Sequence, residues 1–156
     1  MRSYLIAVGR RMPAWVTAGF TEYNKRLPRE LCLKLIEITP AVRTKSTTTG
    51  KALAAEAQRI RDALPQDALV IALDEHGIQF NSQVLSRKIA AWNRQGRDLA
   101  FIIGGTDGID GELKQTADLL WSLSTMTLPH ALARIIVVEQ IYRAWTILQN
   151  HPYHRE

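Results

Sequence analysis

The chain has 156 residues, enough for one domain, residues 1–156, with a substantial core. Its composition, 46% hydrophobic and 22% charged, is ordinary for a soluble globular protein, and no apolar run reaches the roughly 18 residues of a membrane span. The single cysteine, Cys32, excludes an internal disulfide and indicates the reducing cytoplasm.

Positive charge is concentrated in the first part of the chain. The formal net charge is +5, but residues 1–61 hold 12 Lys or Arg against 4 Asp or Glu, whereas residues 62–156 hold 8 against 11. This asymmetry indicates a polyanionic partner, and a solvated basic face is the alternative. The residues expected nearest to phosphate groups are Arg10, Arg11, Lys25, Arg26, Arg29, Arg43, Lys45 and Lys51.

Strands and helices are expected to alternate through the first half of the chain. The apolar run at residues 4–8 predicts a buried strand, and Pro13 begins a helix that reaches Lys25, with apolar contacts from Trp15, Ala18, Phe20 and Tyr23. A second strand follows at residues 33–38. Residues 43–51 read as a mobile basic loop, and the alanine-rich residues 51–64 as a helix.

The same alternation continues in the second half. Strands are expected at residues 68–74, 99–105 and 119–124, with Gly77 marking the turn after the first of them. Helices are expected from an Asn81 or Ser82 cap to Asn93, at residues 112–117 and at residues 130–148. This order predicts an α/β fold with a mostly parallel sheet and helices on both faces.

The last helix, residues 130–148, is apolar around most of its circumference. A narrow polar strip with Arg134, Glu139 and Arg143 is expected, and Glu139 and Arg143 are spaced to form an ion pair. A helix that packs on one core needs only one apolar stripe. We therefore expect a second subunit to cover this helix in a homodimer.

Three expected strand ends carry features of a ligand site. They are Leu73–Asp74, Gly104–Gly105 and the segment SLSTMTLPH at residues 122–130. In open parallel sheets ligands bind beyond the carboxyl ends of strands, although a Gly-Gly pair can also be a simple tight turn. Dinucleotide, phosphate-loop and serine-hydrolase motifs are absent, and the four histidines lack metal-ligand spacing, so no metal is expected.

The segment at residues 122–130 is uncharged and rich in small hydroxyls. Such a loop can bury a flat apolar ring, such as adenine, while its backbone reads the edge of the ring. A polar loop that caps the next helix is the alternative. The final NHPYHRE, residues 150–156, presents a similar choice between a solvated tail and a tail held against a site as a source of acid–base groups.

Several motifs together resemble the RlmH-type methyltransferases of the SPOUT superfamily. They are AVGRRMPAWVTAGFTEYNKRLP near the start, IGGTDG, WSLSTMTLPHALARIIVVEQIYRAW and the terminal NHPYHRE, and they span essentially the whole chain. The resemblance implies a carboxyl-terminal deep trefoil knot, a homodimer and methyl transfer from S-adenosyl-L-methionine (SAM). The acceptor it implies is N3 of a pseudouridine in 23S rRNA, in the large subunit or the 70S ribosome.

The resemblance also assigns residues to roles. The SAM contacts that it implies are Leu73, Gly104, Leu123, Ser124, Thr125, Met126, Thr127 and Leu128. For the chemistry, His154 is a candidate base with His130 as its rival, Tyr153 a partner of the acceptor base, and Arg155 and Arg143 candidate cations. Each tail is expected to border the SAM pocket of the other subunit.

One position departs from the family pattern, because Ile78 stands where a lysine is often expected, and no RNA contact is assigned there. Two other functions remain open from the sequence. The first is a SPOUT-fold RNA-binding or ribosome-assembly protein without catalysis, and the second is a SPOUT methyltransferase that modifies another RNA base.

Overall fold

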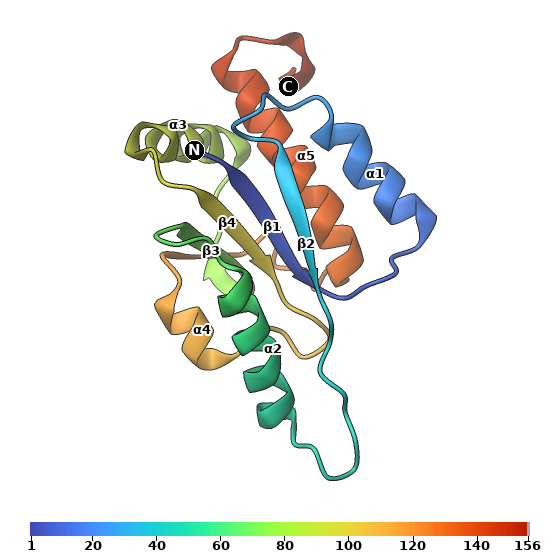
Figure 1. The fold of residues 1–156 in the computed structure, drawn as a ribbon. Coiled ribbons are helices and arrows are strands. Elements are labelled where there is room, and N and C mark those ends of the chain that lie inside the picture. The colour runs from blue at the N-terminus through green and yellow to red at the C-terminus, as the bar shows by residue number, and fades with distance from the viewer. Residues whose placement is uncertain (156) are drawn as a thin grey trace.

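A computed structural model describes residues 1–155, which form a layered α/β structure (Figure 1). The elements in chain order are β1 Ser3–Val8, α1 Ala14–Asn24, β2 Leu33–Ile38, α2 Thr49–Ala63, β3 Leu69–Ile78, α3 Ser82–Gln95, β4 Leu99–Ile103, α4 Gly111–Thr116, β5 Leu119–Trp121, α5 His130–Leu148 and a final 3₁₀ turn, η1, Pro152–His154. None of the helices in this described part is long and apolar enough to cross a membrane.

All five strands belong to one sheet with the order β2-β1-β4-β3-β5, and every pairing is parallel. Strand β1 lies between β2 and β4, with Leu5 opposite Leu35 of β2 on one side and Phe101 of β4 on the other. The predicted α/β fold with helices on both faces is confirmed. Because the strands are parallel, their carboxyl ends all meet at one edge of the sheet.

The two faces of the sheet bury two separate cores. In β1, Leu5 and Ala7 face a core shared with α1, α3 and α5, whereas Ile6 and Val8 face a core shared with α2 and α4. Figure 1 shows α2 and α4 in front of the sheet and the other three helices behind it. Helices on both faces explain why β1 and β4 are continuous apolar runs without alternation.

Helix α5 packs between α1 and α3 and against the sheet, so other elements of the same chain cover most of its circumference. The apolar residues Val137, Val138 and Ile141 are buried. The surface that a second subunit could still cover is therefore a strip, which we call the outer strip of α5, and it consists of Leu132, Ile136, Gln140, Arg143 and Ile147.

Arg134 does not lie on a polar strip with Glu139 and Arg143, and that expectation was wrong. Its side chain is 2% exposed, and nine residues of helix separate it from Arg143 by about 180°. Glu139 and Arg143 do share a face, and the predicted ion pair between them is confirmed, with 2.8 Å between Arg143 Nη2 and Glu139 Oε1.

Four local expectations also need correction. Gly77 does not mark a turn after the third strand, because β3 continues to Ile78. Strand β5 ends at Trp121 rather than residue 124, and α2 begins at Thr49, inside the expected loop. In α1, Phe20 is buried, but Trp15 is 55% exposed and therefore contributes little to the core.

Gly77 is a glycine because the backbone of β5 passes directly over it. The register between β3 and β5 shifts between Leu73 and Ile78, so that both residues pair with Trp121. A Cβ at Gly77 would lie 2.6 Å from the carbonyl carbon of Leu120, closer than real Cβ contacts allow. Glycine thus permits the bulge that ends the sheet beside β5.

We expect Gly77→Ala to lower the free energy of unfolding by about 1–3 kcal/mol, because backbone atoms of β5 cannot move aside as a flexible side chain can. Gly111→Ala is the matched control, since a Cβ at Gly111 meets no atom within 4 Å. Urea unfolding followed by circular dichroism measures both. Equal midpoints for the two variants would contradict the packing argument.

Candidate active site

A cavity of about 650 Å³ opens at the carboxyl ends of β3, β4 and β5. Its wall comes mainly from residues 73–76 of β3, the glycine turn after β4 and the loop between β5 and α5. Of the predicted cofactor residues it contains Leu73, Gly104, Leu123, Ser124, Met126, Thr127 and Leu128, whereas Thr125 is not among its lining residues. The cavity lies where the sequence placed a ligand.

The turn after β4, residues 104–108, brings backbone rather than side chains to the cavity. The Gly108 amide donates to the Gly105 carbonyl over 3.1 Å, and Gly108 has a φ of +80°. A Cβ on Gly104 would lie 2.5 Å from the carbonyl carbon of Gly108. The glycines therefore form a tight turn and also line the cavity, while their expected role in letting the backbone approach a ligand stays a prediction.

The loop from Ser122 to Pro129 is folded by its own hydroxyl groups. Ser122 Oγ donates to the Ser124 carbonyl over 2.9 Å, and the Met126 amide donates to Ser124 Oγ over 2.9 Å. The residue that precedes α5 is Pro129, and no side-chain hydrogen bond caps the helix. The alternative interpretation of this loop as a helix cap is wrong.

Charged residues line the other side of the cavity. Asp74 follows Leu73, the residue of β3 at which the pairing with β5 becomes irregular. Its Oδ2 accepts from the His76 amide over 3.2 Å, and its Oδ1 lies 3.5 Å from Lys114 Nζ in α4. Lys114 and Asp107 were missed by the sequence reasoning. The segment after β4 begins at the sheet edge that holds the cavity, so residues of this segment could have been expected near a ligand. No sequence motif, however, distinguishes Lys114 and Asp107 from their neighbours.

His130 is the first residue of α5 and lines the cavity. Its Nδ1 is buried and has no hydrogen-bond partner among residues 1–155. One turn later, Arg134 donates to the Gly9 carbonyl over 2.9 Å and to the Glu37 carboxylate over 2.8 Å. These bonds fix the start of α5, and with it His130, against the carboxyl ends of β1 and β2.

The tail is held against the far end of α5 and is not a freely solvated segment. Tyr153 Oη donates to Glu139 Oε1 over 3.0 Å, its ring centroid lies 4.6 Å from that of Tyr142, and the Arg143 guanidinium lies 5.0 Å from its centroid. Burial, and secondarily the Glu139 carboxylate, raises the pKa of Tyr153 well above its ordinary value, so the phenol stays neutral. His154 has a buried Nδ1 without a partner among the described residues, and Arg155 is exposed.

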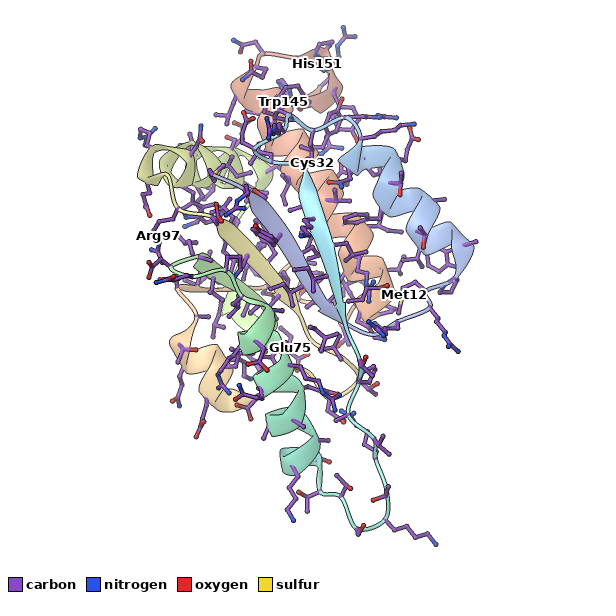
Figure 2. All side chains as sticks on the ribbon, viewed as in Figure 1. Met12, Cys32, Glu75, Arg97, Trp145 and His151 are labelled. Atoms are coloured by element: carbon purple, nitrogen blue, oxygen red, sulfur yellow. The ribbon has the colours of Figure 1, made fainter. Side chains whose placement is uncertain are left out.

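The structure does not bring this tail to the cavity of its own chain. Helix α5 has 19 residues, a length of about 28 Å, and it separates His130 from Tyr153, His154 and Arg155. Figure 2 shows His151 of the tail at one end of the molecule and Glu75, which lines the cavity, toward the other. Of the predicted catalytic residues, only His130 lies at the cavity.

A second groove of about 330 Å³ follows the outer strip of α5. His154 and Arg143 line it near the tail, together with Phe80 and residues of the α3 start. Trp121 and Leu123 belong to both the groove and the cavity. The groove therefore extends from the tail to the wall of the cavity.

The cations expected near phosphate groups fall into two sets. Lys25 and Arg26 pair with Glu22, and Arg43 pairs with Glu56 and Asp107. The other set forms no side-chain hydrogen bond or ion pair within residues 1–155 and consists of Arg10, Arg11, Arg29, Lys45 and Lys51. Four of this set follow β1 or β2, at the edge of the sheet that holds the cavity, and Arg29 precedes β2 at the opposite edge.

A family model described as Predicted SPOUT methyltransferase matches residues 1–154. The chain belongs to the SPOUT methyltransferase family. It is 50% identical over 155 residues to proteins from Burkholderia thailandensis and Burkholderia vietnamiensis, both named Ribosomal RNA large subunit methyltransferase H, with 99% of each chain covered.

Solved structures support the fold of this SPOUT methyltransferase at low identity. A probable methylase family protein from Haemophilus influenzae has a TM-score of 0.58 and 14% identity, covering 99% of this chain and 70% of its own. A probable methyltransferase from Bordetella pertussis has the same TM-score and identity, covering 92% and 95%. The trefoil knot that the family resemblance implies stays a prediction.

The raised pKa of Tyr153 gives a prediction for the tail. Contacts of the neutral phenol should stabilise the docked tail fully below pH 10, the ordinary value, and be lost only as the pH rises through the raised pKa. Ultraviolet titration of wild type minus Tyr153→Phe should therefore show one tyrosine that ionises above pH 10. In Glu139→Gln the pKa of Tyr153 should fall but remain above its ordinary value, because burial is the larger cause of the shift. Ionisation of the wild-type Tyr153 at its ordinary pKa would contradict the docked tail.

Proposed function

We propose that this protein is a homodimeric, SAM-dependent methyltransferase that methylates N3 of a pseudouridine in 23S rRNA, on the assembled ribosome in the cytoplasm. The observation that carries the proposal is the cavity of about 650 Å³ formed by the turn at residues 104–108 and the loop at residues 122–129. Relatives 50% identical over nearly the full chain support rRNA as the substrate class, because their name specifies ribosomal RNA of the large subunit.

The residues of the cavity suit a nucleoside. Its volume lies within the usual range for small-molecule sites, and its lining is mostly backbone and small or apolar side chains. Leu73, Leu123 and Leu128 offer apolar surface to a flat base. The Ser122 and Ser124 hydroxyls bond to backbone groups of their own loop, the Ser124 carbonyl and the Met126 amide, and so hold the loop in its conformation. Other backbone groups of the loop would read the edge of the base. When bound, SAM supplies a methyl group already activated on a sulfonium, so the chain has to contribute no covalent nucleophile.

The remaining tasks belong to side chains. The acceptor nitrogen must be aligned with the methyl group, its proton must be removed, and the negative charge that spreads to the flanking carbonyl oxygens must be stabilised. His154 is the proposed base, and its buried, unpartnered Nδ1 shows that the ring is not committed to a structural hydrogen bond through that atom. Tyr153 would contact the acceptor base, and Arg155 is exposed and free to contact phosphate or a carbonyl oxygen.

These tail groups can serve a cavity only in a second copy of the chain. The length of α5, about 28 Å, holds each tail away from the cavity of its own chain. If two chains pack their α5 helices antiparallel, each tail arrives near the first turn of the other α5, where His130 lies. The active site would then be composed of both chains.

The outer strip of α5 supports this arrangement. Leu132 is 39% exposed, and Ile136 and Ile147 are half-buried. The three residues repeat at helical spacing on α5, and Ile136 and Ile147 line the groove. A second helix laid on this strip would bury apolar surface at a favourable free energy of about 25 cal/mol per Å². Since Trp121 and Leu123 line both the groove and the cavity, docking there reaches the wall of the cofactor site.

The unpaired cations support rRNA as the partner. Arg10, Arg11, Lys45 and Lys51 follow the carboxyl ends of β1 and β2, at the same sheet edge as the cavity. Phosphate contacts of this kind position an RNA without reading its sequence. A dimer of such small chains offers little surface to select one nucleotide in naked RNA, which favours the assembled ribosome as the source of specificity.

The proposal is tested by incubation with labelled SAM and ribosomes that lack the modification, followed by mapping of the labelled nucleotide. We expect one labelled pseudouridine, with methylation much faster on ribosomes than on free rRNA. Label on another base would support a SPOUT enzyme of different specificity. Calorimetry that detects no SAM binding would instead favour the ribosome-assembly protein without catalysis.

The two candidate bases can be separated. We expect His154→Ala to lower the single-turnover rate by about 10²–10⁴-fold while SAM affinity stays unchanged, because general-base catalysis contributes that much. His151→Ala, an exposed histidine in the same tail, measures the cost of altering the tail itself. If His154→Ala keeps the wild-type rate and His130→Ala does not, His130 is the base.

The shared site predicts complementation between two inactive variants. One variant ends at Asn150 and so lacks the tail, and the other carries Thr127→Trp, which blocks the cavity. After subunit exchange, half of the dimers in an equal mixture are mixed and each has one complete site, so about a quarter of wild-type activity should return. If activity does not return although mass spectrometry shows mixed dimers, the tail does not act across the subunits.

A further inference from the structure

Arg43 lies in the segment between β2 and α2, and its guanidinium joins two carboxylates from different parts of the chain. Nη1 donates to Glu56 Oε2 over 2.9 Å, and Nε donates to Asp107 Oδ2 over 3.0 Å. Nη1 also donates to the Ala41 carbonyl over 2.8 Å. A planar guanidinium can make these bonds together, because its donors point in fixed, diverging directions.

Glu56 is the buried anchor of this group. It belongs to α2, its side chain is 3% exposed, and its Oε2 also accepts from the Ala41 amide over 2.9 Å. A buried carboxylate needs such donors, because an unpaired charge in this environment is costly. Glu56 thus fixes where the segment leaves β2 and where Arg43 can reach.

Asp107 is the more exposed of the two carboxylates. It lies in the turn at residues 104–108, which lines the cavity, and its side chain is 35% exposed. Three of the five residues of this turn are glycines, which have the greatest conformational freedom of all residues. One backbone hydrogen bond, from Gly108 to Gly105, closes the turn on itself. A contact from outside the turn would therefore restrict its conformation.

We propose that Arg43 is a positioning residue that clamps the cavity turn through Asp107, with Glu56 as its anchor. This inference rests on the proposed function for the identity of the ligand in the cavity. Arg43 therefore does not serve as a phosphate contact, which was its expected role. The clamp also ties the turn to the segment between β2 and α2 that carries Arg43.

The clamp is tested with Asp107→Asn, Arg43→Gln and the double variant. Asp107→Asn leaves the Arg43–Glu56 pair intact, so it should fold even if Arg43→Gln does not. We expect each single variant to weaken SAM binding by about tenfold in calorimetry, the scale at which such networks act. The double variant should bind SAM no more weakly than Arg43→Gln alone, because the Arg43–Asp107 interaction is already lost in that single variant.

Hydrogen exchange without SAM gives a second measurement. The amides of residues 104–108 should exchange faster in Asp107→Asn and Arg43→Gln than in wild type. Arg61→Gln is the matched control, since it removes a cation from α2, the helix of Glu56, that forms no side-chain hydrogen bond or ion pair within residues 1–155, and it should change neither the exchange nor the SAM affinity.

The clamp would be overturned by wild-type SAM affinity in Asp107→Asn or Arg43→Gln, or by unchanged hydrogen exchange at residues 104–108. Additive losses of SAM affinity in the double variant would also overturn it, because they would mean that Asp107 contacts SAM directly. Absence of SAM binding by the wild-type protein would refute the proposed cofactor instead. The exchange measurement would still decide whether Arg43 holds the turn.

Discussion

The parallel pairing of five strands is the constraint on which the site depends. Parallel strands place every carboxyl end at one edge, so the turn after β4, the loop after β5 and the end of β3 meet there without any long-range motif. Both faces of the sheet are covered by helices, which keeps the strands apolar and leaves this edge as the place where polar loops can gather. The cavity is a consequence of that geometry.

Two sets of arginine–carboxylate contacts join separate segments of the chain at this edge. Arg134 connects the first turn of α5 to Gly9 and Glu37, and so places His130. Arg43 connects the glycine turn to the buried Glu56. Both use a guanidinium to join segments distant in sequence, because its fork can satisfy several acceptors at once. Loops that are flexible by composition thereby acquire defined positions.

The length of α5 divides the functional residues between its two ends. His130 lies at the cavity, whereas Tyr153 and His154 pack at the other end, about 28 Å away along the helix. The outer strip of α5 and the groove beside it lie between them. An antiparallel second copy would resolve this separation, and it would explain why a tail that is well packed in one chain carries groups suited to acid–base chemistry.

Elements that depend on local patterns could be predicted from the amino-acid sequence. The strand at Leu33–Ile38, the helix at His130–Leu148, the Asn81 cap and the loops of the cavity were all predicted, because apolar period, capping residues and proline positions act over a few residues. Three features became visible only in the folded chain. Gly77 lies under β5, and Arg43 is bound to Glu56 and Asp107. The tail lies far from the cavity of its own chain. Those facts depend on which segments meet across the sheet, as Arg43 and Asp107 do, and a pattern along the chain carries no information about that pairing.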